Sequence, residues 1–582
     1  MKKALLIGIN SKYIHTNLAI RDLYECSKGQ VPQQLEMMEF TINQHPPMIL
    51  DEIYRQKADI LLFSCYIWNI EMVTQLIATY RKIAPNTTII LGGPEVSYHA
   101  AAFLKAHPAV DYLIKGEGEA TLPALLCALA AEPTAQICAL QALPGILYRS
   151  AEQIIENTDA PAFPMELLPF PYPDLEQLTG KILYFESSRG CPFRCSYCLS
   201  SIAGKVRLMP LEKVFAYLTR FLDAKVPQVK FVDRTFNCNK THALAIWQFL
   251  KEHDNGVTNF HFEVSAHLFD RETLDFLRTV RPEQFQLEVG VQSTNPDTIT
   301  QIKRTTDTEK LLGICQEIDS YQNIHQHLDL IAGLPFEDKA SFARSFDTVF
   351  AIRPQQLQLG FLKILKGSQM EREAAEHEIE YNHLAPFEVL RTKWLSYDDI
   401  LLLKGVEDMV ERYYNSGRFR NTLQHLLADI SSPYTFFEAL GCYYFEQGYH
   451  LLSIPKERAH SILKAFYEAK YNAPYSAAMK EVALFDLCLK EKPKKLPDFI
   501  LNERRYAHKD ETHTFFHTAE HIASYLPHYA QEAPIKISRL AHLQGFTHDV
   551  TDPALPERLT FILFDYDHPD LLGNARWWKV TL

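Results

Sequence analysis

The stretch FESSRGCPFRCSYCLSS, residues 185–201, places three cysteines within eight residues. Cys191, Cys195 and Cys198 follow the pattern C-x3-C-x2-C. The other eight cysteines are scattered along the 582 residues, and each is most simply explained as a small buried hydrophobe. The three in this stretch therefore need a common cause.

Three thiols on one short loop can bind metal in more than one way. A structural zinc site normally needs four ligands, and no second cysteine pair or C-x2-C…H-x3-H arrangement lies nearby. A thioredoxin-like C-x2-C pair would leave Cys191 unexplained. Three thiolates can, however, hold three irons of a [4Fe–4S] cluster and leave the fourth iron open to another ligand. Gly190 and Pro192 suit such a tight loop, and Phe193 and Tyr197 would shield it from water.

Short apolar strands follow the cysteine stretch at intervals, which is typical of a (β/α) barrel. Periodic helical segments such as TLDFLRTV and KLLGICQEIDSY separate them. In such a barrel the functional side chains lie at the C-terminal ends of the strands. The six predicted strands cover residues 182–188, 228–237, 260–267, 284–293, 327–335 and 356–368.

The first 150 residues alternate between predicted strands and helices. Strands are predicted at 3–10, 58–68 and 86–97, and VDYLIKGEGEATLPALL runs from a strand into a helix. This pattern indicates a doubly wound sheet, in which ligands bind beyond the carboxyl ends of the strands. Glycines at these ends let the backbone approach a large ligand closely: Gly92, Gly93, Gly116 and Gly118. A mononucleotide or flavin would also suit, and no G-x-G-x-x-G motif indicates a dinucleotide.

The bulk composition is that of a folded protein, with 47% hydrophobic and 22% charged residues. The net charge of −12 does not favour a nucleic-acid binder, although the clusters KEKPKKLP and RRYAHKDETH are basic. Both clusters more often mark solvated loops. The apolar stretch ILLFSCYIWNI is far shorter than the ~20 residues that cross a bilayer. We expect a cytoplasmic protein without a membrane partner.

The last third is predicted to be mainly helical, beginning with APFEVLRTKWLSYDDILLLKGVEDMVERYYNSG. Near its end His513, His517 and His521 are spaced by four, so one helix would place all three on one side. Such a row could form a metal site or a pH-sensitive site. A solvated helix face or a strand turn is the favoured interpretation, since no cysteine or carboxylate recurs at ligand spacing.

The cysteine loop resembles the C-x3-C-x-aromatic-C motif of radical S-adenosylmethionine (SAM) enzymes. The resemblance implies that Cys191, Cys195 and Cys198 ligate a [4Fe–4S] cluster and serve catalysis, with SAM chelating the open iron. Electron transfer would then cleave SAM to a 5′-deoxyadenosyl radical. The expected SAM contacts are Tyr197, Asp233, Ser265, Glu288, Gln292, Arg304 and Gly333.

The segments ILGGPEVSYHA and VDYLIKGEGEATLPALL resemble the cobalamin-binding domain that precedes the barrel in class B radical SAM enzymes. No D-x-H-x-x-G motif is present, so we expect no histidine below the cobalt and read His15 and His99 as loop residues. A domain that kept the fold and lost the cofactor is the alternative. The expected cobalamin contacts are Asn10, Tyr13, Ser64, Tyr66, Gly92, Gly93, Pro94, Glu95, Gly116 and Glu117.

These features predict an α/β protein with four parts. They are a Rossmann-like cobalamin-binding domain at 1–150, a proline-rich linker at 151–180, a partial (β/α)6 radical SAM barrel at 181–385, and a mainly helical domain at 386–582. The last part resembles an uncharacterised C-terminal helical domain found on some cobalamin-dependent radical SAM proteins.

The resemblance implies an enzyme that uses a [4Fe–4S] cluster, SAM and cobalamin, with the methylation of an unactivated carbon as the favoured reaction. A rearrangement or ring contraction without methyl transfer is the alternative within the same chemistry. A redox or corrinoid sensor is the alternative of another class. The enzyme would need an electron donor such as flavodoxin or ferredoxin. A tRNA base, small metabolite, lipid or peptide substrate stays open.

Overall fold

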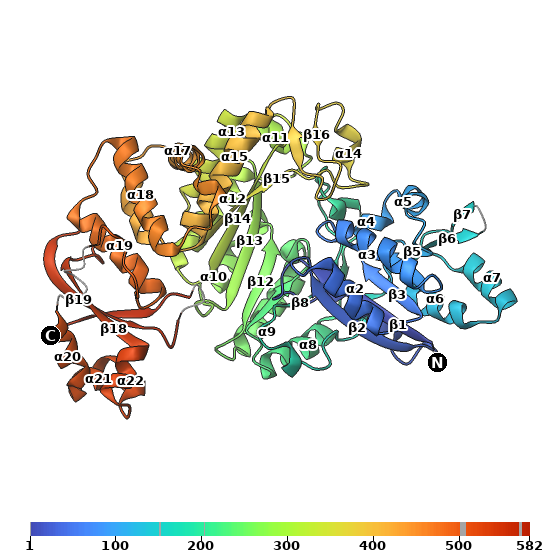
Figure 1. Ribbon diagram of the computed structural model, residues 1–582, viewed down its shortest axis with the longest axis horizontal. Coiled ribbons are helices and arrows are strands. Elements are labelled where there is room, and N and C mark those ends of the chain that lie inside the picture. The colour runs from blue at the N-terminus through green and yellow to red at the C-terminus, as the bar shows by residue number, and fades with distance from the viewer. Residues whose placement is uncertain (1, 151–152, 203, 501–507, 570–572) are drawn as a thin grey trace. The chain divides into compact units, whose positions relative to one another are not determined.

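A computed structural model describes residues 2–150, 153–202, 204–500, 508–569 and 573–582. The chain divides into two compact units, Met1–Lys339 with Gly360–Tyr397 and Ala340–Leu359 with Asp398–Leu582. In Figure 1 the first unit runs from blue to yellow, and most of the second is orange and red. The part of the chain that the structure describes holds no helix with the length and hydropathy of a membrane span.

The N-terminal sheet has seven strands in the order β2-β1-β3-β4-β5-β6-β7. The first five pair in parallel, and β6 and β7 are added antiparallel at one edge. The predicted doubly wound sheet is thus confirmed, with β2, β6 and β7 as strands that the sequence patterns did not indicate. The bounds are β1 Lys3–Asn10, β2 Gln34–Thr41, β3 Ile60–Ser64, β4 Thr88–Gly92, β5 Tyr112–Ile114, β6 Ile146–Ser150 and β7 Gln153–Glu156.

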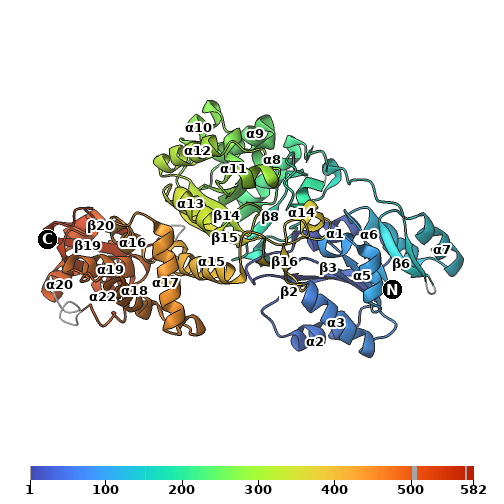
Figure 2. The same ribbon diagram turned by 90° about the horizontal axis from the view of Figure 1, so that it is seen from above.

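Helices cover both faces of this sheet (Figure 2). Apolar side chains of α2, α3 and α5 pack on one face, and those of α1, α6 and α7 on the other. Both faces of the central strands are therefore buried, which explains why they read as continuous apolar runs. The helices are α1 Leu18–Ser27, α2 Pro46–Arg55, α3 Ile70–Ile83, α4 Pro94–Ser97, α5 Ala100–Ala106, α6 Thr121–Ala130 and α7 Pro133–Ala142.

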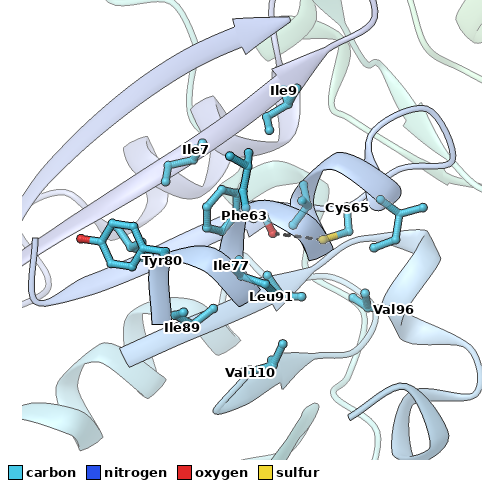
Figure 3. Packing of buried hydrophobic residues seen from close by; sticks show 14 of the residues in the cluster. Ile7, Ile9, Phe63, Cys65, Ile77, Tyr80, Ile89, Leu91, Val96 and Val110 are labelled. Atoms are coloured by element: carbon cyan, nitrogen blue, oxygen red, sulfur yellow. Dashed lines mark hydrogen bonds between the residues drawn. The ribbon is translucent and has the colours of Figure 1, made fainter. Parts of the chain in front are cut away.

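Figure 3 shows the first of these cores, where Ile7 and Phe63 of the sheet face Ile77 and Tyr80 of α3. At the end of β4 the backbone passes very close to its neighbour. Gly93 has a φ of +110°, and a Cβ there would lie 2.5 Å from the carbonyl oxygen of Cys65. A glycine is required at this position by the packing of the sheet itself, before any ligand is considered.

The second sheet has six strands in the order β15-β14-β13-β12-β11-β8, which matches the six predicted strands of a partial barrel. Along β13 the side chains alternate: odd-numbered residues are buried against the helices and even-numbered ones are half-buried on the other face. The strands are β8 Leu183–Phe185, β11 Gln228–Phe231, β12 Asn259–Val264, β13 Phe285–Gln292, β14 His325–Ala332 and β15 Gln356–Phe361. The intervening helices are α8 Leu211–Asp223, α9 Lys240–Glu252, α10 Arg271–Leu277, α11 Pro296–Gln301, α12 Thr308–Tyr321 and α13 Lys339–Phe350.

The loop after β1 joins the two sheets of the first unit. Ile182 donates a backbone hydrogen bond of 2.7 Å to Ile14 O, next to the first strand of the second sheet. His15 Nδ1 lies 2.6 Å from the hydroxyl oxygen of Tyr184 on that strand. The proline-rich segment adds buried Tyr172, whose hydroxyl accepts from Tyr184 N–H at 2.8 Å. These contacts fix the carboxyl ends of the two sheets relative to each other.

The second unit is mainly helical, as predicted, and ends in a three-stranded antiparallel sheet of order β18-β19-β20. Its helices are α15 Tyr397–Met409, a π-helical turn Val410–Asn415, α16 Arg420–Leu426, α17 Pro433–Glu446, α18 Lys456–Tyr471, α19 Ala477–Lys490, α20 Lys509–His517, α21 Ala519–Tyr525 and α22 Pro534–Leu540. Its strands are β18 Ala541–His548, β19 Glu557–Asp565 and β20 Arg576–Val580.

One prediction for the C-terminal third was wrong in detail, and the histidine row is arranged differently from a single helix face. The helix expected from residue 386 begins only at Tyr397, because residues 389–391 form a strand (β17, Val389–Arg391) that pairs with β16 (Glu380–Tyr381). The histidine row does not lie on one helix, since α20 ends before Thr518 and α21 begins after it. The rings of His513 and His517 stack at 3.9 Å, whereas His521 stacks on Phe515. The first four residues of the basic stretch RRYAHKDETH lie outside the described residues.

Candidate functional site

The cysteine loop follows β8 and is held by two backbone hydrogen bonds to other segments and one within the loop. Ser196 N–H donates to Ile302 O at 2.9 Å, Met370 N–H donates to Ser196 O at 2.8 Å, and Cys198 N–H donates to Cys195 O at 3.1 Å. Cys195 is buried, and Cys191 and Cys198 are half-buried. The backbone of the loop is thus tied to neighbouring segments, and its three thiols are buried or half-buried.

The spacing of the three thiols bears on whether the motif binds one zinc ion or an iron–sulfur cluster. Three thiolates on one zinc ion would lie about 3.8 Å apart, given a Zn–S distance of about 2.3 Å. Among the described residues, Cys191, Cys195 and Cys198 are not a group whose sulfur atoms all fall within 4.8 Å of one another. The three sulfur atoms are therefore not placed as the ligands of one tetrahedral zinc ion.

Arg304 connects the loop to the end of β13. Its Nη1 lies 3.8 Å from Cys195 Sγ and 3.4 Å from the Tyr197 hydroxyl, and its Nη2 donates to Gly290 O. Burial raises the pKa of the Cys195 thiol, and the Arg304 charge offsets part of that rise. Burial also raises the pKa of the Tyr197 hydroxyl. A buried cation beside the thiols would stabilise their ionised form.

Several buried polar atoms around the loop have no hydrogen-bond partner among the described residues. They include Ser196 Oγ, Gln292 Oε1 and Arg304 Nε. Gln292 also adopts a φ of +73°, which a non-glycine residue rarely takes. Buried polar groups are normally paired, so this set fits a polar ligand that supplies both donors and acceptors, as SAM does.

Asp233, which follows β11, is bound by the residues just before the cysteine loop. Its carboxylate accepts from Ser187 N–H at 2.9 Å, from the Ser187 hydroxyl at 2.7 Å and from the Ser188 hydroxyl at 2.6 Å. Burial raises its pKa to about 6, although these hydrogen bonds oppose the rise. Asp233 therefore lies at the loop and orders it.

Two further predicted SAM residues are placed at strand ends by different contacts. Ser265 follows β12, and its hydroxyl lies 3.0 Å from His267 Nδ1, whose ring is 5.8 Å from that of Phe193 in the loop. Gly333 follows β14 with a φ of +91°, and a Cβ there would lie 2.8 Å from Val389 Cγ1. The structure thus brings Ser265 near the loop and gives Gly333 a packing role.

Glu288 does not share their position, because it lies in the middle of β13. Its Oε2 is 2.9 Å from Lys230 Nζ and 2.8 Å from His261 Nε2, and His327 is 4.0 Å away. Burial alone would raise the pKa of Glu288, but these partners outweigh it and lower the pKa below its usual range. Glu288 is the centre of a buried ion-pair network on the inner face of the sheet.

A cavity of about 710 Å³ lies at the carboxyl ends of β1, β3, β4 and β5. Barrel residues Tyr184, Glu186, Arg189, Leu199 and Arg234 also line it. Eight of the ten predicted cobalamin contacts are on its wall: Asn10, Ser64, Tyr66, Gly92, Gly93, Pro94, Gly116 and Glu117. Tyr13 and Glu95, both described residues, are not part of this wall. Tyr13 is 75% exposed, and Glu95 is buried beside Lys366 at 3.3 Å.

The cavity wall contains residues that the sequence patterns did not single out. The rings of Tyr66 and Trp68 stack at 4.4 Å with an angle of 5°, and Trp68 Nε1 donates to Ile9 O at 3.1 Å. This flat aromatic pair suits a planar macrocycle. Asn17 bridges neighbouring strand ends by donating to Asn10 and Ser64, at 3.1 Å each. The tertiary fold brings Trp68 and Asn17 to the cavity wall, and no local signal marked them, whereas Tyr66 was among the predicted contacts.

An acidic group lies where the cavity meets the barrel. Arg189 is 2.5 Å from a carboxylate oxygen of Glu119 and 2.5 Å from one of Glu186. Asp22 lies beside these two acids, and burial together with their charges raises its pKa well above the ordinary value. Asp22 Oδ1 and Glu119 Oε2 have no partner among the described residues. These acceptors fit the amide side chains that surround a corrin ring.

The two candidate lower-face histidines are engaged elsewhere. His15 lines the cavity but bonds Tyr184, and burial lowers its pKa. His99 Nε2 lies 3.1 Å from Glu371 and is not part of the described cavity wall. The expectation that no histidine sits below the cobalt is consistent with both placements and stays a prediction.

The fold and the site define a radical SAM protein with a preceding B12-binding domain. Residues 6–126 match the family described as "B12 binding domain", residues 185–349 match "Radical SAM superfamily", and residues 375–564 match "Protein of unknown function (DUF4080)". The chain therefore carries a B12-binding domain and a radical SAM domain, followed by a C-terminal DUF4080 region. This confirms the resemblance found in the sequence.

Curated relatives match parts of the chain. It is 25% identical over 335 residues to the 2-(S-pantetheinyl)-carbapenam-3-carboxylate methyltransferase of Streptantibioticus cattleyicolor, covering 51% of this chain and 46% of that protein. It is 34% identical over 134 residues to the anaerobic magnesium-protoporphyrin IX monomethyl ester cyclase of a Synechocystis strain, covering 22% and 26%. The chain thus spans less than half the length of these relatives.

A solved structure is similar in fold over most of the chain. The cobalamin-dependent S-adenosylmethionine radical enzyme OxsB with aqua-cobalamin bound superposes with a TM-score of 0.58 at 14% identity, covering 92% of this chain and 80% of that one. This likeness concerns the fold alone.

Proposed function

We propose that this protein is a cobalamin-dependent radical SAM enzyme that methylates an unactivated carbon of its substrate. The observation that carries the proposal is the shared cavity, whose wall comes from the strand ends of the B12-binding sheet and from barrel residues beside the cysteine loop. Leu199, next to Cys198, is part of that wall. Two cofactors held on either side could therefore act on one bound substrate.

When bound, the cluster and SAM supply a 5′-deoxyadenosyl radical, and cobalamin supplies a transferable methyl group. The chain's own residues bind and orient these groups. Cys191, Cys195 and Cys198 would hold the cluster, while Arg304, Tyr197 and Gln292 would bind SAM. The Tyr66–Trp68 pair and the glycine-rich strand ends would hold the corrin. An electron donor such as flavodoxin or ferredoxin completes the proposal.

The relatives support methyl transfer through what their names state. The Streptantibioticus protein is a methyltransferase, and the hopanoid C-3 methylase of Methylococcus capsulatus is 26% identical over 220 residues, covering 36% of this chain and 41% of that protein. These names concern those proteins, and methylation by this chain is our proposal.

Reductive SAM cleavage tests the first half of the proposal. Anaerobically reconstituted protein, incubated with SAM and a low-potential reductant, is expected to release 5′-deoxyadenosine. Cys195→Ala should lose both the four-iron content and this product, because one cluster ligand is missing. Cys138→Ala is the matched control, since Cys138 is an exposed thiol on α7. A wild-type protein that binds the cluster but yields no 5′-deoxyadenosine would favour a sensor and contradict the enzyme.

A second candidate keeps the radical chemistry without methyl transfer. It is favoured by the match to the Synechocystis cyclase, whose name states a ring-forming reaction. SAM carrying a deuterated methyl group separates the two candidates. Methyl transfer should give a product, identified in cell extract, heavier by one labelled methyl group. A product without label would support the cyclisation or rearrangement instead.

A further inference from the structure

Two histidines and an aspartate from two chain segments meet in the second unit. His528 lies in a short helical turn, Pro527–Tyr529, after α21. Asp565 is the last residue of β19, and His568 follows it by three residues. One ligand atom from each of the three falls within 4.8 Å of the other two. These residues are outside the B12-binding and radical SAM domains.

The distances match the ligand shell of one small metal ion. His528 Nε2 and His568 Nδ1 each lie 3.2 Å from the same oxygen, Asp565 Oδ2. Ligands on a tetrahedral zinc ion, at about 2.1 Å from the metal, lie about 3.4 Å from one another. Two of the three ligand–ligand distances thus match such a tetrahedron, and the two histidine nitrogens lie within 4.8 Å of each other.

The aspartate is held in place by contacts to its other oxygen. Asp565 Oδ1 accepts from the Tyr529 hydroxyl at 2.9 Å and from Asp567 N–H at 3.1 Å. The Asp565 side chain is only 1% exposed, whereas those of His528 and His568 are 38% and 48% exposed. Hydrogen bonds of this kind orient a metal-binding carboxylate and tune its basicity. The aspartate is therefore fixed in the protein interior, while the two histidines leave the site accessible to solvent.

Charge distinguishes this group from the two other ligand-type groups. Lys230 lies 2.9 Å from Glu288 in the group of Glu288, His327 and Asp329. Arg189 pairs with Glu119 in the group of Asp22, Glu119 and Glu186. In the described part of the chain, by contrast, neither a lysine nor an arginine forms an ion pair with Asp565. A buried carboxylate is normally paired with a cation or coordinates a metal.

We propose that His528, Asp565 and His568 form a binding site for a divalent transition-metal ion, with Zn²⁺ as the fitting ion. Imidazole nitrogen and carboxylate oxygen are the donors that zinc takes together, and the fourth position is left for water or a ligand. The ion would link the turn at residue 528 to the end of the sheet. This assignment is independent of the proposed radical chemistry.

The test uses the full-length, cluster-loaded protein, so that the three cysteines are occupied by iron. Equilibrium dialysis against Zn²⁺ with metal analysis is expected to give one tightly bound zinc per chain in addition to the iron. His528→Ala and His568→Ala should each lose this stoichiometric zinc while keeping the iron. Both histidines are partly exposed, so these variants should fold.

Tyr529→Phe probes the support of the site, and His513→Ala is the matched control. Removing the hydroxyl that orients Asp565 should weaken zinc binding about 10- to 100-fold. His513 lies in a stacked pair of exposed histidines on α20 without a carboxylate in that pair, and its loss should leave the zinc affinity unchanged. The proposal is overturned if the wild-type chain binds no stoichiometric zinc, because two imidazole hydrogen bonds to Asp565 would then explain the distances. It is equally overturned if both histidine variants bind zinc as tightly as wild type.

Discussion

In the cysteine loop all three thiols come from eight consecutive residues, whereas the histidine–aspartate group in the second unit draws on residues 528, 565 and 568. A loop can present its own ligands because neighbouring residues stay close whatever the rest of the chain does. A group assembled from a turn and a strand end depends on the tertiary fold. The histidines that are regularly spaced, 513, 517 and 521, fail to converge because the helix breaks at Thr518.

The largest expected effect concerns a third group, in which Glu288 lies between Lys230 and His261. We expect this group to be an ion-pair network and not a metal site. Glu288→Gln would leave Lys230 without its counter-charge and should lower the free energy of unfolding by about 3–5 kcal/mol. Urea unfolding of both proteins at pH 7 measures the difference.

The contribution of Glu288 to the free energy of unfolding depends on pH, because the pKa of Glu288 is lowered in the folded protein. The unfolded chain binds the proton more readily, so the stabilisation is present above about pH 4.3 and is lost as the pH falls below it. The gap between wild type and Glu288→Gln should therefore shrink in acid. Zinc binding that disappears in Glu288→Gln would show that this group does hold a metal and would break the comparison.

Arg304 tests how far the local cysteine motif depends on the tertiary fold, since it contacts the loop from a distant part of the chain. Arg304→Leu should keep the iron content but lower the rate of 5′-deoxyadenosine formation about 100-fold, because a charge-assisted hydrogen bond contributes about 1.5–3 kcal/mol. Arg278→Leu, at an exposed position just after α10, is the control. Loss of the iron itself in Arg304→Leu would mean that the residue supports the loop and not SAM.

The sequence patterns predicted the parts of the fold whose periodicity is strong. The central strands of the first sheet are apolar runs buried on both faces, and barrel strands such as β13 alternate buried apolar with half-buried residues, so both patterns reveal strands. The edge strand β2 was missed because QLEMMEFT is half-buried and mixes polar with apolar residues. Residues 386–396 read as helical, but the pairing of β17 with β16 overrides that local preference.

The candidate site shows the same division. Cys191, Cys195 and Cys198 could be named from their spacing alone, and the glycine-rich strand ends from their position after strands. Trp68 and Arg189 could not be selected from the sequence, because only the folded chain shows that they line the cavity. Glu288 was expected among the SAM contacts as one polar residue of a strand, and only the folded structure shows Lys230 and His261 as its partners.

The smallest expected effect is that of His513→Ala on stability. An exposed stacked histidine pair has little packing to lose, so the free energy of unfolding should change by no more than about 0.5 kcal/mol. Thermal unfolding measures this. A drop of several kcal/mol would show that the regularly spaced histidines form a working site after all.

The most direct test of the account is the electron paramagnetic resonance spectrum of the reduced protein before and after SAM is added. The His568→Ala variant is the best material, because zinc at the second site cannot then be confused with zinc at the cysteines. We predict a [4Fe–4S] signal that changes when SAM binds to the iron without a cysteine. Zinc in place of iron at Cys191, Cys195 and Cys198, or a four-iron signal that SAM leaves unchanged, would contradict the account.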